Sequence, residues 1–256
     1  MRQLLAFTKK EFTEMIRTGK GYILLLVFVA FGIMNPLMAK LTPWLFDMLS
    51  DSLKTQGITM GKATVTAMTS WEQYYKNMSM EFIVLVIMLC GILVNEYQKG
   101  TLINILTKGL PRWKVIASKA ITMLVTWSVC YWMCFGITFG YNAYFWDNSI
   151  ASHVFLGAVY PYLFGVWLCS VILLVSAYLD TFASVLLSVG AVYAIVYILA
   201  MVPKLEGYLP VKLADGLTLL KGTAQTGDYL PALGITIGLT IVDILLSMIG
   251  FNRKKI

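Results

Sequence analysis

The chain has 256 residues, of which 59% are hydrophobic and 13% are charged, with a formal net charge of +7. An average soluble domain is about a quarter charged, so this composition excludes a soluble globular protein and predicts an all-α integral membrane protein. We expect residues 1–256 to form a single transmembrane domain.

The first 20 residues predict an amphipathic helix that lies along a membrane surface. A stripe recurs every four positions and consists of Leu4, Thr8, Phe12 and Ile16, helped by Leu5 and Met15. The basic residues lie largely off this stripe and are Arg2, Lys9, Lys10 and Arg17. No continuous apolar run precedes Gly21, so we expect this segment to be retained rather than cleaved as a signal peptide.

Six apolar runs are long enough to cross a membrane as helices. A hydrocarbon core about 30 Å thick needs roughly 20 apolar residues at helical rise, and a helix satisfies its own backbone hydrogen bonds there. The expected spans are residues 21–39, 80–95, 119–141, 154–177, 183–202 and 231–250.

The basic residues assign the segments between these spans to the two sides of the membrane. With the N-terminus inside, the cytoplasmic segments are residues 1–20, 95–119, 178–182 and the tail from Phe251. They hold 13 of the 20 Lys and Arg residues and a charge close to +9, against −1 outside. We therefore expect a multi-pass protein of the cell membrane with both termini in the cytoplasm. The positive charge indicates topology and contact with anionic lipids of the bilayer, and no nucleic-acid partner is expected.

The segments expected outside the membrane are longer than simple turns. A helix on the outer leaflet is predicted by leucines at four-residue spacing, namely Leu41, Leu45, Leu49 and Leu53. An aromatic belt before the second span is predicted by Trp71, Tyr74 and Tyr75. A short re-entrant or surface helix before the sixth span is predicted by Leu205, Leu209, Leu213 and Leu217.

Asp243 is a charged residue expected inside the sixth span, about two turns from its inner end. A carboxylate at the bilayer centre costs about 2.5–3.5 kcal/mol on insertion scales, which marks it as functional or paired. Two interpretations stay open: an ion pair with a basic residue near the cytoplasmic face, or a place on a transport route. Glu81 is expected at the outer interface of the second span, and Asp180 is expected to cap the fifth.

Motifs for catalysis or cofactor binding are missing from the sequence. The stretch 57–64, GITMGKAT, has three residues between its glycines where a phosphate loop has four, and Ala63 replaces the residue that binds magnesium. The single His153 is expected at the start of the fourth span, with no second ligand at metal spacing. We expect no metal or cofactor to be bound by this chain, and no enzymatic activity of its own.

Residues 95–119 connect the second and third spans with about 25 residues, far more than a hairpin needs. From Gly100 a helical pattern runs through Thr101, Leu102, Ile105 and Leu106. Gly109 and Pro111 break this pattern, and a second helix is expected to begin at Pro111 or Arg112 and to continue into the third span. Taken alone, the pattern also fits a helix that lies in the lipid headgroups.

This segment resembles the signature of the permeases of ABC-2 type transporters. In that family a Glu at the end of the second span is followed by Gly-Thr-Leu, a leucine pair, a Pro and Arg pattern and a Lys. The residues that carry the resemblance are Glu96, Gly100, Thr101, Leu102, Leu106, Pro111, Arg112 and Lys119. Arg112 directly follows Pro111 here, whereas the family separates them. The resemblance also covers the number and order of the spans.

The resemblance implies that this loop forms a coupling helix seated in a groove of a separate ABC ATP-binding subunit. Its buried anchors would be Leu102, Ile105 and Leu106. Its polar rim would consist of Lys99, Lys108, Arg112 and Lys114. The N-terminal amphipathic helix would be the connecting helix, which also touches the ATPase. ATP and Mg would be bound by that partner subunit.

The resemblance further implies a half-transporter that pairs along its first and fifth spans with a second permease, most simply an identical one, and with two ATP-binding subunits. The expected cargo is hydrophobic or amphipathic and leaves the cell, with a peptide (toxin, bacteriocin or immunity cargo) ahead of a lipid or drug. Two other classes stay open, a membrane scaffold or sensor that docks a cytosolic partner, and an intramembrane enzyme. The enzyme would need catalytic or metal-binding groups at matching depth in facing spans.

Overall fold

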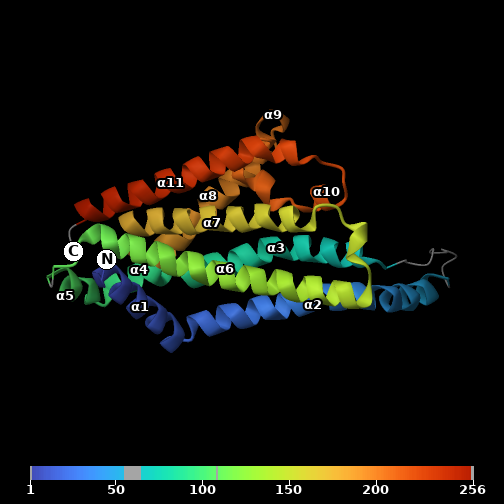
Figure 1. Cartoon of the computed structure of the whole chain (residues 1–256), viewed down its shortest axis with the longest axis horizontal. Helices are drawn as coiled ribbons and strands as arrows, with labels where there is room; N and C mark the ends of the chain where they lie inside the picture. The colour runs from blue at the N-terminus through green and yellow to red at the C-terminus, as the bar shows by residue number, and fades with distance from the viewer. Residues whose placement is uncertain (1, 55–64, 108, 255–256) are drawn as a thin grey trace.

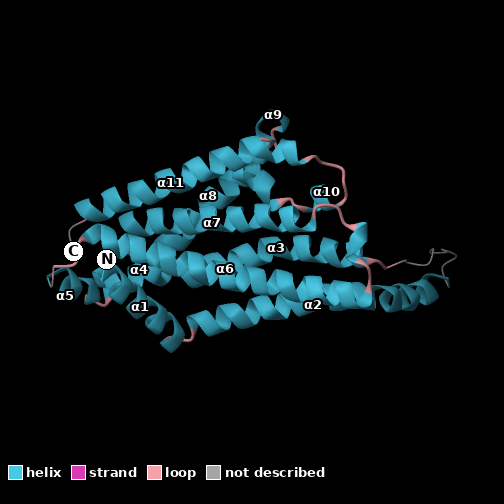
Figure 2. Cartoon of the chain, in the orientation of Figure 1, coloured by secondary structure: helices cyan, strands magenta, loops and turns pink. Residues whose placement is uncertain are grey.

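The computed structural model describes residues 2–54, 65–107 and 109–254, which are almost entirely helical (Figure 2). No strand occurs in these ranges, and six helices are long and apolar enough to cross a membrane. The prediction of an all-α membrane protein with six spans is therefore confirmed. The spanning helices are α2 (Lys20–Lys54), α3 continued by α4 (Ala67–Leu89 and Gly91–Gln98), α6 (Arg112–Phe145), α7 (Val154–Tyr178), α8 (Phe182–Ala200) and α11 (Leu230–Arg253).

The long helices run along the longest axis of the molecule (Figure 1). Both chain termini lie at one end of the bundle, together with α1 (Arg2–Arg17) and α5 (Thr101–Thr107). We call this the termini end, and the other the opposite end. Gly19 turns the chain from α1 into α2 with a φ of +73°, a conformation that glycine adopts without strain.

Aromatic side chains around Trp127 of α6 hold the spans together. The ring of Trp127 packs on Phe28 of α2 and on Phe82 of α3, with centroids 5.8 and 5.9 Å apart. Its indole Nε1 donates a hydrogen bond of 3.0 Å to the carbonyl of Tyr162 in α7. Gly165 of α7 makes room for the ring, because a Cβ at this position would lie 2.2 Å from it. One fully buried side chain therefore joins four spans.

The first span continues past its expected end. α2 is one helix of 35 residues, so the separate surface helix expected over residues 41–53 is wrong. Ala39, the last residue of the predicted span, is fully buried, whereas Leu41, Trp44 and Leu45 in the continuation of the helix are exposed. Pro36 and Pro43 lie inside the helix, which membrane helices tolerate where neighbouring groups satisfy the freed backbone. Outside the described residues lie the side chains of Leu49 and Leu53 and the whole stretch 57–64.

The second span begins earlier than residue 80. α3 starts at Ala67, and Trp71 and Tyr74 are fully buried instead of forming an aromatic belt at the membrane surface. Both rings pack near Phe135 of α6, with centroids 5.6 and 6.3 Å away. The first turns of α3 also carry polar residues on their other face, which lower the mean hydropathy of this stretch. The sequence before residue 80 therefore does not show the apolar run by which a span is predicted.

The segment between α8 and α11 folds over the opposite end as short helical turns. These are α9 (Pro203–Glu206), two 3-10 turns (Pro210–Ala214 and Thr226–Tyr229) and α10 (Leu217–Leu220). The expected leucine stripe does not form one face, because Leu205 is exposed whereas Leu213 is fully buried. Tyr229 stacks on Tyr160 of α7 at 4.5 Å and donates a hydrogen bond of 2.7 Å to the carbonyl of Asp215. A compact cap therefore replaces the single helix expected here.

Candidate coupling site at the termini end

The segment between the second and third spans is built from helices separated by glycine turns. Gly100, with a φ of +63°, lets α4 turn into α5, as its predicted role at a tight helix start requires. Gly109, with a φ of +85°, makes the second turn, and α6 begins at Arg112 after Pro111. The predicted order of helix, break and helix is confirmed for the described residues, which leave out Lys108.

An apolar cluster drawn from five other helices supports α5. Leu102 is fully buried in it, and Leu106 packs at its edge. The other buried members are Phe7, Leu93, Val115, Ile116, Ala177 and Phe251. The expectation that Leu102 anchors a partner subunit is wrong for this structure, because its side chain is already used to seat α5 on the bundle. The side chain of Ile105 lies outside the described residues.

Other apolar residues form the outward surface of this region. Ile103 of α5 is 48% exposed, and Trp113 in the first turn of α6 is 47% exposed. Both belong to the segment that the sequence predicts as the coupling element. An exposed apolar side chain on a short helix is the kind of contact that helix-in-groove recognition uses. The spacing of apolar residues in the sequence did not predict a role for Ile103 and Trp113, because it does not tell which side of α5 faces its own bundle.

Glu96 and Lys119, the charged ends of the predicted signature, meet inside the protein. The Nζ of Lys119 lies 3.0 Å from Oε2 of Glu96 and 2.5 Å from Oε2 of Glu11 in α1. Lys119 is 1% exposed. At the rim, Lys10 pairs with Glu96, and its Nζ lies 3.0 Å from Glu11 and 2.8 Å from Glu14. We call these five residues the charge cluster.

The ionisable groups of α1 depend on one another and on the spans. Burial raises the pKa of Glu11, against the opposing effect of the positive charge on Lys119. Burial acts to lower the pKa of Lys10, but hydrogen bonds to Glu14 and Glu96 outweigh it and raise that pKa. Burial likewise acts to raise the pKa of Glu14, but its bond to Lys10 lowers it overall. Separating α1 from α4 and α6 would therefore leave buried charges unpaired, which is costly.

The acids of the charge cluster are close enough together to hold a metal ion. Ligand oxygens of Glu11, Glu14 and Glu96 all lie within 4.8 Å of one another. The ammonium groups of Lys10 and Lys119, however, are already paired with these same carboxylates. Internal ion pairs therefore account for the convergence of the acids, and the cluster serves as a joint between α1, α4 and α6.

The face that α1 buries overlaps the predicted stripe only in part, since Leu4, Thr8 and Phe12 are half-buried. Its buried residues are Phe7, Glu11 and Met15, one helical turn apart. Ile16, from the predicted stripe, is 51% exposed, and Leu5 is 69% exposed. The local pattern could not reveal this, because Glu11 is buried only through a lysine that comes more than 100 residues later.

Arg112 binds the C-terminal end of α11. Its Nη1 lies within hydrogen-bond distance of three carbonyls, those of Phe251 (3.0 Å), Asn252 (3.1 Å) and Lys254 (2.6 Å). Carbonyls at a helix end have no backbone partner within the helix, and a basic side chain satisfies them. Arg112 is half-buried, and its predicted place in a polar rim stays a prediction.

Asp180 pairs with Lys254 at 2.6 Å and does not cap α8 as predicted. The cap is Thr181, whose Oγ1 accepts a hydrogen bond of 3.3 Å from the backbone N–H of Ser184. The end of α11 is thus tied to the turn between α7 and α8, and through Arg112 to the start of α6. Four spanning helices are fastened together around the coupling segment.

Two carboxylic acids lie inside the spans, away from the charge cluster. Glu81 is fully buried, with its Oε1 3.4 Å from Sγ of Cys134, so its expected interfacial position is wrong. The early start of α3 moves it toward the middle of the span. Asp243 of α11 accepts a hydrogen bond of 3.1 Å from the hydroxyl of Ser170 in α7. No basic residue pairs with Asp243 among the described residues, and both interpretations, an ion pair and a place on a transport route, stay predictions.

A groove that consists of a mixed hollow and an apolar hollow opens between α3 and α8. Only Val185 and Val189 of α8 are buried, so this helix is loosely covered. The mixed hollow, of about 240 Å³, has a mainly apolar lining that also includes the polar side chains of Tyr75, Lys76, Ser79, Tyr197 and Asp215. The apolar hollow, of about 230 Å³, is lined among others by Ile83, Val86, Leu186, Gly190 and Tyr193. Phe82 lines both hollows, which therefore adjoin.

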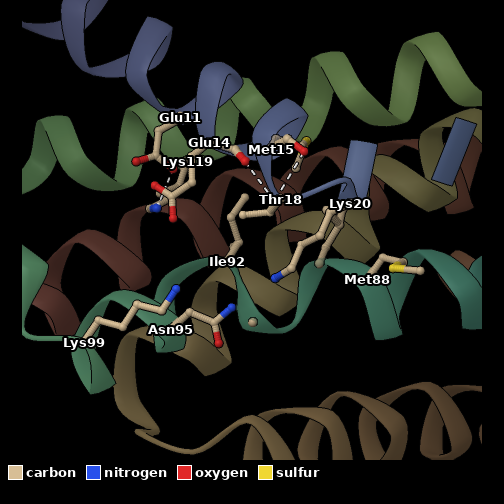
Figure 3. A pocket seen from close by; sticks show the side chains of 12 residues that line it. Glu11, Glu14, Met15, Thr18, Lys20, Met88, Ile92, Asn95, Lys99 and Lys119 are labelled. Carbon is tan, nitrogen blue, oxygen red and sulfur yellow. Dashed lines mark hydrogen bonds and ion pairs between the residues drawn. The ribbon is translucent and has the colours of Figure 1, made fainter. Parts of the chain in front are cut away.

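A cavity of about 90 Å³ lies beside the charge cluster (Figure 3). It is bounded by α1, the start of α2, the region where α3 passes into α4, and Lys119 of α6. The lining includes two further lysines, Lys20 and Lys99. Neither forms an ion pair with a carboxylate among the residues that the structure describes, which distinguishes them from Lys10 and Lys119.

Comparison with known proteins gives one family match. The model of a family described as ABC-2 family transporter protein matches residues 5–256, which is nearly the whole chain. No curated protein matches the sequence.

Proposed function

Because the chain belongs to the ABC-2 transporter family, and is thus the transmembrane subunit of an ABC transporter, we propose that it exports a hydrophobic or amphipathic cargo, most simply a peptide. The family pairs with a separate ABC ATP-binding subunit, to which we assign the binding of ATP and Mg. The termini end then faces the cytoplasm, in accordance with the excess of basic residues there.

The observation that carries this proposal is the charge cluster under the coupling segment. It joins α1, α4 and α6 through buried ion pairs, and α5 sits on these helices through Leu102. A push on α5 is therefore transmitted to the second and third spans and to α1 together. We propose that two exposed residues of this segment contact the ATP-binding subunit, namely Ile103 in α5 and Trp113 in the first turn of α6.

The groove between α3 and α8 supports an amphipathic cargo. Its mixed hollow includes Lys76 and Asp215 among apolar side chains, and its apolar hollow is lined mainly by aliphatic side chains. Each hollow is smaller than the roughly 300 to 1,000 Å³ of a pocket for a drug-sized ligand. We propose that a second permease, most simply an identical one, completes this site across the loosely covered α8.

The test of coupling is Ile103→Asp, with Ile150→Asp at the opposite end as the matched control. Ile150 is 55% exposed, so both changes place a carboxylate on an exposed isoleucine. We expect Ile103→Asp to lose copurification of the ABC ATP-binding subunit and cargo-stimulated ATP hydrolysis, while the control retains both. Leu106→Asp should do the same, but Leu106 also packs in the bundle, so its effect includes a loss of stability.

Three results would count against the proposal. Unchanged ATPase coupling in Ile103→Asp would mean that α5 does not contact the ATP-binding subunit. Labelling of the termini end from outside the cell would reverse the topology. A chain that never associates with an ATP-binding subunit, but docks another cytosolic protein, would support the scaffold or sensor instead.

A further inference from the structure

Two basic side chains at the cavity beside the charge cluster are not used by the coupling mechanism. Lys20 is the first residue of α2, and Lys99 ends α4. Figure 3 shows their ammonium groups turned toward a common space near the amide of Asn95. Their positive charges disfavour each other, and in the described part of the chain no carboxylate forms an ion pair with either. Such a pair of cations favours an anion between them.

The charged groups around the cavity are one anion short of neutrality. Four positive charges and three negative ones meet there, carried by Lys10, Lys20, Lys99, Lys119, Glu11, Glu14 and Glu96. The carboxylates are already engaged by Lys10 and Lys119. One monoanion at Lys20 and Lys99 would therefore balance the charge without competing for the existing ion pairs.

The remaining lining suits a phosphate that carries an acyl chain. Asn95 adds an amide that can donate hydrogen bonds. The N-terminus of the long helix α2 begins at Lys20 and adds partial positive charge. The rest of the wall is apolar and comes from Met15, Met88, Leu89 and Ile92. A free inorganic anion gains nothing from this wall, whereas the chain of a lipid would cover it.

We propose that Lys20 and Lys99 bind the phosphate of an anionic phospholipid headgroup. Lys20 follows the turn at Gly19, and Lys99 precedes the turn at Gly100, so the lipid bridges the hinge of α1 to the hinge of α5. It thereby holds the coupling element against the bundle. This proposal rests on the function proposed above in one respect only, which is the leaflet that supplies the lipid. Because the proposed function places the termini end in the cytoplasm, the lipid belongs to the inner leaflet.

The test measures binding of phosphatidylglycerol to the purified full chain in detergent, by native mass spectrometry and by thermal unfolding at increasing lipid concentration. We expect Lys20→Gln combined with Lys99→Gln to bind at least about tenfold more weakly than wild type, since a hydrogen bond to a charged group is lost at each lysine. The matched control, Lys9→Gln combined with Arg17→Gln, removes the same charge from exposed positions on α1 and should bind as wild type. Lys20→Arg combined with Lys99→Arg should also retain binding.

Three outcomes would overturn the proposal. The double glutamine variant could bind the lipid as tightly as wild type, or the control could lose binding equally, which would mean diffuse attraction to the charged end. Inorganic phosphate could displace the lipid at equal concentration, which would mean a free-anion site. If the double variant does not fold, Lys99→Gln alone decides, because Lys99 is exposed at a helix end. The assay contains no ATP-binding subunit, so its failure is separate from a failure of the coupling proposal.

Discussion

Glu96 and Lys119 flank the coupling segment in the sequence and form an ion pair of 3.0 Å inside the bundle. The pair brings the two ends of the segment together inside the bundle, while α5 lies between them in the sequence and at the termini end of the molecule (Figure 1). Glu11 joins α1 to the same base through Lys119, at 2.5 Å. Because unpaired buried charges are costly, we expect these helices to move as one body.

Removing Lys119, the buried cation of the charge cluster, should destabilise the protein more than removing an exposed charge does. Lys119→Met leaves Lys10, at the rim, as the remaining cation for the buried Glu11 and Glu96, which costs up to about 3–5 kcal/mol. Thermal unfolding of the purified variant in detergent measures this as a lower Tm. Lys9→Met, on the exposed side of the same helix α1, is the control and should stay within about 0.5 kcal/mol of wild type.

Restoring the charge balance should recover much of that loss. Glu11→Gln combined with Lys119→Met removes one acid together with the cation, so the net charge of the charge cluster returns to its original value. We expect the double variant to have a higher Tm than Lys119→Met alone. Equal Tm values would mean that the lysine stabilises by packing rather than by its charge.

The spans were predictable where hydropathy alone determines them. The fourth was expected at residues 154–177 and is observed at Val154–Tyr178, because apolar residues fill the whole run between polar flanks. The second was expected from residue 80 but begins at Ala67, because its first turns bury aromatic residues on one face and expose polar ones on the other. Periodicity within a mixed stretch does not say whether the buried face meets lipid or protein.

The candidate site was only partly predictable for a related reason. The signature supplied Glu96 and Lys119, but it does not include their partner Glu11, which lies in the predicted surface helix. Its burial requires three segments that are distant in sequence to meet, which no local pattern encodes. Arg112 was expected to face a partner for the same reason, since its acceptors lie about 140 residues later.

Gly165 should tolerate no side chain. A Cβ there would lie 2.2 Å from the ring of Trp127, which is enclosed by aromatic residues of three other helices and cannot shift freely. Gly165→Ala should therefore lower the free energy of unfolding by about 1–3 kcal/mol. Gly238→Ala in α11 is the control, because a Cβ at Gly238 meets nothing within 4 Å. A Tm unchanged in Gly165→Ala would contradict the close contact of α6 and α7 at this point.

Arg112 should control the order of the last turn of α11. Arg112→Gln removes the guanidinium that accounts for three hydrogen bonds to Phe251, Asn252 and Lys254. We expect backbone amides of that turn to exchange with deuterium at least about tenfold faster, the equivalent of one lost charged hydrogen bond. Amides in the first turn of α11, at the opposite end, serve as the internal reference. Equal acceleration at both ends would indicate general destabilisation instead.

Asp243 should be replaceable by a neutral amide. Its described side-chain partner is the hydroxyl of Ser170, which lies 3.1 Å from Asp243 Oδ2 and also 2.7 Å from the carbonyl of Trp167. An asparagine can donate to Ser170 Oγ while that hydroxyl donates to the carbonyl, so we expect Asp243→Asn to keep the wild-type Tm within about 1 kcal/mol and to keep transport. Ser170→Ala should be more harmful, by about 1–3 kcal/mol, because it leaves the carboxyl buried without its partner. Normal Tm with lost transport in Asp243→Asn would instead assign the carboxylate to the path of the cargo.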